Sequence, residues 1–106
     1  MPYRKLNGIL SICRKAGKLA VGFAPMKEAL PKASCVVTES DISPKTYKEV
    51  WYFCQKQNVP VQALPMDKEQ LGMAIGKKAA VAAILDKGFF DRIRQLCVEA
   101  TQQPSE

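Results

Sequence analysis

The fold is decided by residues 16–30, Ala-Gly-Lys-Leu-Ala-Val-Gly-Phe-Ala-Pro-Met-Lys-Glu-Ala-Leu. In this stretch Gly17 is suited to end a preceding helix, and residues 19–21 are predicted to form a short strand. Gly22 is predicted to turn the chain into a second helix that has Pro25 at its first position. A strand that passes through glycine into a helix leaves several backbone N–H groups unpaired, and such groups bind anions. The stretch therefore predicts an anion-binding turn.

Positive charge is concentrated around this turn. Residues 1–32 contain seven lysines and arginines and one acidic residue, so this part carries the whole net charge of +6. Lys18 is predicted to lie at the lip of the turn. Three further cations are close in sequence: Arg14, Lys15 and Lys27. A one-sided excess of positive charge indicates a surface for a polyanion, which we interpret as the phosphate backbone of RNA. A basic surface that only keeps the protein soluble is the alternative.

Composition describes a globular protein. A length of 106 residues corresponds to one domain, and the 47% of apolar residues can fill one core. No apolar run approaches the length of a membrane span, and no apolar signal core follows the charges at the amino terminus. We therefore expect a cytoplasmic protein that does not enter a membrane.

Cysteine and histidine content argues against catalysis and metal binding. The four cysteines lie far apart among apolar neighbours, and none forms a C-x-x-C pair, so we interpret them as reduced core thiols: Cys13, Cys35, Cys54 and Cys97. Histidine is absent. Its absence removes histidine-activated nucleophiles and the commonest metal ligand. We predict no metal and no cofactor.

Periodicity and turn residues predict helices and strands in the order α-β-α-β-α-β-α-β-α. The predicted helices cover residues 3–16, 24–30, 44–57, a short segment between Asp67 and Gly76, and a last segment after Asp86. The predicted strands cover residues 19–21, 35–38, 61–64 and 79–85. Alternation with short connections indicates a three-layer α/β/α sandwich around a four-stranded mixed sheet. The tail, residues 101–106, is expected to fray.

Local signals place the ends of two predicted helices. Ser43 is the expected N-cap of the third helix, with Pro44 as its first residue. Asp67 and Gln70 have the spacing of a capping box, and Gly76 is expected to end that short helix.

The third predicted helix carries an apolar stripe. Its members repeat at helical spacing: Tyr47, Val50, Trp51 and Cys54. We expect the stripe to dock on the sheet. This makes Trp51 a core residue rather than a platform on which a base stacks.

From about Leu6 to Leu96 the chain resembles a known family. The segments that carry the resemblance are Arg-Lys-Ala-Gly-Lys-Leu at 14–19, Gly22 with residues 27–30 after it, and Leu-Gly-Met-Ala-Ile-Gly at 71–76 with residues 79–86 after it. They are similar to the RNA-binding superfamily of the archaeal large-subunit ribosomal protein L7Ae, and within it to the short bacterial members. The resemblance implies a three-layer sandwich.

The resemblance also implies where RNA would bind. The family surface is built from the Gly22 turn with the second helix, the start of the third helix, and the loop after Gly76. In members that bind kink-turn RNA, this surface enters the widened groove at tandem sheared G·A pairs, and an apolar loop holds a flipped-out base. Lys18 and Gly22 match positions that approach the RNA backbone.

The base-reading residues of the kink-turn binders do not carry over. Where those members have Asn, Glu and Lys, this chain has Ala24, Pro25 and Glu28. Alanine and proline side chains make no hydrogen bonds, and a carboxylate repels the acceptor edge of a purine. Lys77 and Lys78 replace the apolar loop segment. The prediction is a protein that grips RNA through phosphate and backbone shape more than through bases.

The predicted RNA-binding residues are Arg14, Lys15, Gly17, Lys18, Gly22, Phe23, Ala24, Lys27, Lys77 and Lys78. The expected partner is a structured RNA, ribosomal or regulatory. Sequence leaves open whether the protein is a permanent ribosomal component or a transient factor of ribosome assembly, transcription or translation. It does not predict the oligomeric state.

Two other classes of function are open. The first is a protein-interaction adaptor that has lost RNA base recognition. The second is an enzyme, because Glu39, Asp41 and Asp86 lie near predicted strand ends, where α/β proteins place active sites. We prefer to explain these acids as helix caps and turn residues, since no nucleophile–base pair, nucleotide fingerprint or metal spacing supports chemistry. We therefore predict a non-enzymatic protein.

Overall fold

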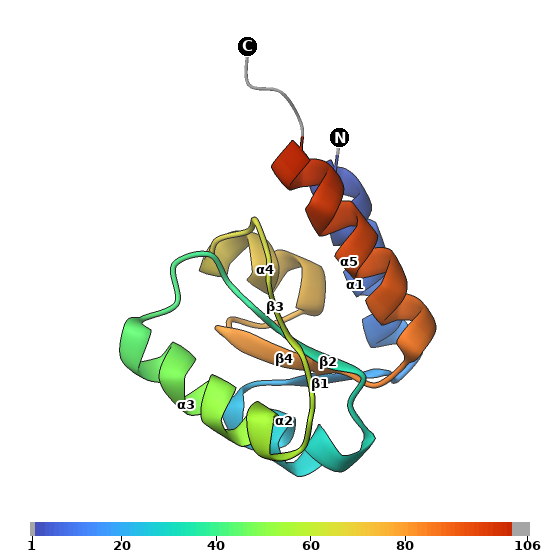
Figure 1. The fold of residues 1–106 in the computed structure, drawn as a ribbon. Helices are drawn as coiled ribbons and strands as arrows, with labels where there is room; N and C mark the ends of the chain where they lie inside the picture. Colours follow the sequence, from blue (N-terminus) through green and yellow to red (C-terminus); the bar gives the residue numbers. More distant parts are fainter. Residues whose placement is uncertain (1, 103–106) are drawn as a thin grey trace.

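A four-stranded mixed sheet, in the order β1-β4-β2-β3, forms the middle layer of the molecule (Figure 1). The computed structural model describes residues 2–102. The strands are β1 (Leu19–Val21), β2 (Cys35–Thr38), β3 (Val61–Ala63) and β4 (Val81–Ile84). β4 runs antiparallel to β1 and β2, whereas β2 and β3 are parallel. The predicted mixed sheet is confirmed.

Helices cover both faces of the sheet. They are α1 (Pro2–Lys15), α2 (Phe23–Ala29), α3 (Pro44–Lys56), α4 (Lys68–Ile75) and α5 (Lys87–Gln102), with a 3₁₀ turn at Leu30–Lys32. In Figure 1, α1, α4 and α5 lie above the sheet, and α2 and α3 lie below it. The predicted element order and the α/β/α sandwich are confirmed.

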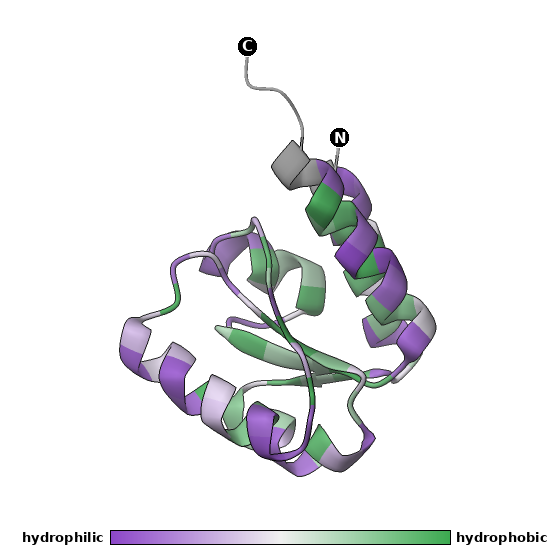
Figure 2. Cartoon of the chain, in the orientation of Figure 1, coloured by the Kyte–Doolittle hydropathy of each residue, from purple (hydrophilic) through white to green (hydrophobic). Residues whose placement is uncertain are grey.

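Strand alternation divides the core into two clusters. Ala82 and Ile84 of β4 pack among side chains of α1, α4 and α5. Val81 and Ala83 point to the other face and pack against α2 and α3. Figure 2 shows hydrophobic residues along the strands. All four residues of β4 are buried, as expected of a central strand covered on both sides.

Capping side chains set the helix ends that sequence predicts. The Ser43 hydroxyl accepts a hydrogen bond from the Thr46 N–H at 3.2 Å. Asp67 and Gln70 form the reciprocal capping box, with bonds of 2.8 and 2.9 Å. Gly76 ends α4 in the left-handed conformation, with φ of 91°. These three predictions are confirmed.

The prediction that Trp51 is a core residue is wrong. Its side chain is 49% exposed, and Tyr47 is 37% exposed. Only Val50 and Cys54 of the predicted stripe are buried against the sheet. The flank of α3 that carries Trp51 lies beside the start of β3, which is the edge strand, so no further strand covers it.

Helix α5 extends further than the sequence predicts. α5 continues through Thr101 to Gln102, so the predicted fraying does not begin at residue 101. The remainder of the predicted tail, residues 103–106, lies outside the described residues. Within residues 2–102, no helix combines the length and apolar character needed to cross a membrane.

Candidate nucleic-acid interface

Helices α2, α3 and α4 all begin at one end of the sheet. β4 is antiparallel to β1 and β2, so it starts where they finish. The Gly22 N–H donates to the Val81 carbonyl at 2.9 Å, and the Glu39 N–H donates to the Ala80 carbonyl at 3.0 Å. We call this the helix-start end of the sheet. It brings together the Gly22 turn, the start of α3 and the loop after Gly76.

The Gly22 turn holds fewer free donors than expected. The Gly22 N–H is already bonded to Val81, and its carbonyl accepts from the Met26 N–H at 2.9 Å. α2 begins at Phe23, so Pro25 is its third residue and supplies no N–H. The predicted cradle of several unpaired amides is therefore wrong in extent. It reduces to the N–H groups of Phe23 and Ala24.

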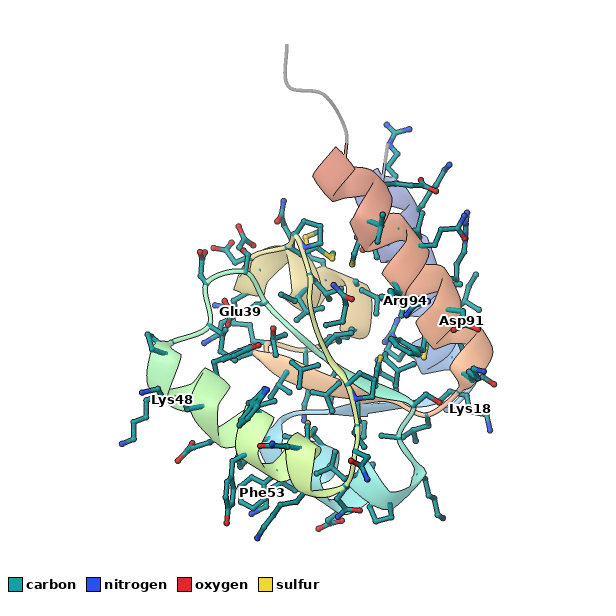
Figure 3. All side chains as sticks on the ribbon, viewed as in Figure 1. Lys18, Glu39, Lys48, Phe53, Asp91 and Arg94 are labelled. Atoms are coloured by element: carbon teal, nitrogen blue, oxygen red, sulfur yellow. The ribbon has the colours of Figure 1, made fainter. Side chains whose placement is uncertain are left out.

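Lys18 lies at the opposite end of the sheet. Its carbonyl accepts from the Leu85 N–H at 2.9 Å, just beyond the last residue of β4. Figure 3 shows Lys18 and Glu39 on opposite sides of the molecule. The prediction that Lys18 forms the lip of the Gly22 turn is wrong, because β1 separates the two residues. Lys15 and Gly17 adjoin Lys18 and share its position in the fold.

Arg14 reaches the loop after α4 even though its neighbours do not. Its guanidinium lies across Gly76, where an added Cβ would stand 2.5 Å from Nη1. Lys77 and Lys78 follow directly, and their backbone packs against Gly72. The structure therefore places Arg14 beside the loop that carries Lys77 and Lys78, as the prediction of a shared basic surface requires.

Lys27 is held on the face formed by α2 and α3. Its ammonium nitrogen lies 4.2 Å from the ring centroid of Phe53 and 5.7 Å from that of Phe23. The two rings meet edge to face at 6.1 Å. Such cation–π contacts contribute about 0.5–1 kcal/mol at exposed sites. Ala24, exposed at the start of α2, offers no side-chain donor.

A cleft opens at the helix-start end between the beginnings of α3 and α4. Its volume is about 500 Å³. Four acidic and two basic side chains line it: Glu39, Asp41, Asp67, Glu69, Lys68 and Lys78. Ser43 and Thr46 of α3 line it as well. Sequence reasoning treated Glu39 and Asp41 as turn or catalytic candidates, so it missed their place in this surface.

Glu39 is the unusual residue of the cleft. It is 4% exposed, and within the described residues its carboxylate has neither a hydrogen bond nor an ion pair. The Asp67 carboxylate, by contrast, caps α4. Its carboxylate borders the cleft and forms no bond within the described protein, so it is open to a ligand that supplies hydrogen-bond donors.

The predicted acid candidates do not form a catalytic pair. Asp86 follows β4 at the far end of the sheet, where its carboxylate accepts from the Phe89 N–H at 3.1 Å and caps α5. Glu39 lies beside the start of β4. Among residues 2–102, no group of three potential ligands is arranged to hold a metal ion.

The four cysteine thiols are buried and form no disulfide bond within the described residues. Burial raises the pKa of Cys54 and of Cys97 to about 11. Burial, with a smaller contribution from the Asp86 carboxylate, raises the pKa of Cys13 to about 11. Burial and then the neighbouring thiols raise the pKa of Cys35 further. Thiols in this state are protonated at neutral pH and are poor nucleophiles.

Comparisons with known proteins agree with this geometry. Residues 4–93 match the profile of the ribosomal protein L7Ae/L30e/S12e/Gadd45 family. A protein of unknown function from Bacillus halodurans is 26% identical, with a TM-score of 0.81 over 90% of this chain and 98% of that chain. The Giardia lamblia 15.5kD RNA binding protein is 18% identical, with a TM-score of 0.69 over 91% of this chain and 83% of that chain. No curated protein matches the chain.

Proposed function

The chain belongs to the ribosomal protein L7Ae/L30e/S12e/Gadd45 family, and we propose that it binds structured RNA at the helix-start end of its sheet. The observation that carries the proposal is the cleft with an unpartnered Glu39, next to a cationic loop. The name of the Giardia structural neighbour, an RNA binding protein, supports the same class of ligand.

The loop after Gly76 and the cleft contact different parts of the RNA. Arg14, Lys77 and Lys78 form the cationic rim, which contacts phosphates without reading sequence. The cleft has four carboxylates against two ammonium groups, so it repels a phosphate. It fits instead the donor-bearing edge of a nucleobase, whose amino or imino hydrogens the Glu39 carboxylate accepts.

Kink-turn reading by α2 is not part of the proposal. Ala24 and Pro25 have no side-chain donor, and Glu28 has only acceptors where kink-turn binders carry a lysine. The affinity therefore comes mainly from phosphates and backbone shape, with one base held at Glu39. No catalytic step is proposed.

Two pairs of lysines provide a matched test, because Lys77 and Lys78 belong to the rim whereas Lys15 and Lys18 lie at the far end of the sheet. We would measure binding of a panel of folded RNAs by fluorescence anisotropy across salt: bacterial ribosomal RNA fragments, a kink-turn RNA and a plain duplex. The variant Lys77→Glu/Lys78→Glu changes the rim. The variant Lys15→Glu/Lys18→Glu makes the same change of net charge at the far end of the sheet. Long-range attraction is altered equally in both, so a difference between them reports direct contacts.

Three phosphate contacts predict that log affinity of the wild type falls with log salt at a slope of about −2 to −3. We expect the rim variant to bind about tenfold more weakly or worse, with a slope reduced by about 1.5 to 2. The far-end variant should keep the wild-type slope. Equal losses in the two variants, or a larger loss in the far-end variant, would contradict the proposed surface.

A further inference from the structure

A second hollow lies along α3, towards the end of the helix. It lies between α3 and the start of β3 and has a volume of about 400 Å³. We call it the aromatic groove. The residues that matter to its chemistry are Tyr47, Trp51 and Gln55 of α3, with Asn58, Pro60 and Val61 opposite. The volume falls in the range of sites that hold a small organic group such as a nucleobase.

The rings in the groove are open, unlike the other aromatic rings of α3. The ammonium of Lys56 lies 4.7 Å from the Tyr52 centroid, and that of Lys27 lies 4.2 Å from the Phe53 centroid, so cations occupy both ring faces. Within residues 2–102, neither a cation nor a second ring lies against Tyr47 or Trp51. Trp51 is 49% exposed. Open rings on a protein surface are stacking platforms.

We propose that the aromatic groove holds an unpaired RNA strand that continues from the structured element, with a base stacked on Trp51. This inference rests on the proposed function of the cleft. The two sites lie along the same helix, because Thr46 lines the cleft and Tyr47 lines the groove. A strand that follows α3 from the cleft towards the end of the helix therefore reaches the groove.

Charge favours RNA over a peptide as the occupant. The groove lining contains no carboxylate. α3 carries three lysines and one glutamate, and Figure 3 shows Lys48, one turn before Trp51, on the side of α3 that faces away from the sheet. A phosphate at the edge of the aromatic groove can pair with Lys48 while the base of the same nucleotide enters the groove. The side-chain amides of Gln55 and Asn58 offer donors and acceptors to any base edge, which predicts weak sequence preference.

Trp51 is the only tryptophan, so its fluorescence reports the groove alone. We would titrate the protein with a 12-nucleotide oligouridylate, and with a folded RNA made with and without a single-stranded uridylate tail. Stacking on the indole should quench the fluorescence when the oligonucleotide or the tail is present. Loss of one stacked base costs about 5- to 150-fold in affinity. We therefore expect the tail to strengthen binding about tenfold.

Matched variants separate stacking from general effects. Trp51→Ala should abolish the gain from the tail, and Trp51→Phe should keep most of it. Tyr52→Ala removes the neighbouring ring, which is 52% exposed and outside the groove, and should change tail binding less than about twofold. Far-ultraviolet circular dichroism checks that each variant is folded.

The outcomes distinguish the groove from the cleft. If the tailless RNA binds but the tail adds neither affinity nor quenching, the inference is overturned and the proposed function stands. If the oligouridylate quenches Trp51 while no folded RNA binds, the groove is supported and the proposed function fails. Quenching by an extended proline-containing peptide, with none by the oligouridylate, would overturn the inference and make the groove a peptide site.

Discussion

Replacing Glu39 by glutamine tests whether the cleft keeps an acceptor ready for RNA. Glu39→Gln preserves side-chain size and removes the charge. The carboxylate has no partner among the described residues, so the substitution breaks no hydrogen bond or ion pair in the free protein. Relief of the repulsion between Glu39 and the other three carboxylates of the cleft should raise the free energy of unfolding by about 1 kcal/mol. In a domain of this size that corresponds to a rise in melting temperature of about 4–8 °C.

The same substitution should weaken RNA binding. A hydrogen bond to a charged group contributes about 1.5–3 kcal/mol, which corresponds to about 10- to 150-fold in affinity. The glutamine carbonyl still accepts one bond, so Glu39→Gln belongs at the lower end, near tenfold, and Glu39→Ala should lose more. Opposite signs for stability and binding are the mark of a group whose partner is the ligand.

Urea titration and fluorescence anisotropy measure the two effects. Glu49→Gln is the matched control, because Glu49 is an exposed carboxylate of α3 outside the cleft lining. We expect it to leave stability within about 0.5 kcal/mol of the wild type and to leave RNA affinity nearly unchanged. A Glu39→Gln protein that is less stable than the wild type, or that binds RNA equally well, would refute the reasoning.

Two further predictions concern the scaffold. Gly76→Ala should lower the free energy of unfolding by about 1–2 kcal/mol, because Gly76 has φ of 91° and an added Cβ would meet the Arg14 guanidinium. The control Gly17→Ala, with φ of 72° and open space around the residue, should lower it by only about 1 kcal/mol. Equal losses of the two variants in urea titration would show that Arg14 moves away freely. The four buried thiols should resist a disulfide reagent at pH 8 in the folded protein and react completely in urea. Because their pKa values are raised in the folded state, stability should fall as pH rises above about 9 and continue to fall towards 11, and a melting temperature that stays constant over this range would contradict the assignment.

Sequence predicts features whose cause is local. Ser43, and the pair Asp67 and Gln70, form hydrogen bonds within one helical turn, so spacing alone identifies them. Gly76 ends α4 because its own backbone takes a positive φ. The order of elements follows from such signals, and the three-layer arrangement follows from the order.

Features that depend on strand direction were not predictable in the same way. Lys18 and Gly22 are close in sequence, but a strand advances about 3.3 Å per residue and the three residues of β1 place them at opposite ends. Arg14 reaches the loop after α4 through a contact with Gly76, far along the chain. Likewise, helical spacing shows that Trp51 is on an apolar stripe, but the width of the stripe that is covered depends on the edge strand β3.

The net charge of +6 explains attraction of RNA but not its orientation, which depends on where the charges lie in three dimensions. Basic residues of the first 32 positions do not share one surface, because Lys18 lies at the far end of the sheet and Lys27 lies on the face formed by α2 and α3. The rim combines Arg14 with Lys77 and Lys78 from the part of the chain that is balanced in charge. The overall excess attracts RNA at long range without orienting it. Orientation comes from the contrast at short range, where cations of the rim favour phosphate and the four carboxylates of the cleft repel it. In the proposed mode of binding, an RNA turns its backbone to the rim and a base towards Glu39, so the acids of the cleft would select the pose even though the cations would supply most of the attraction.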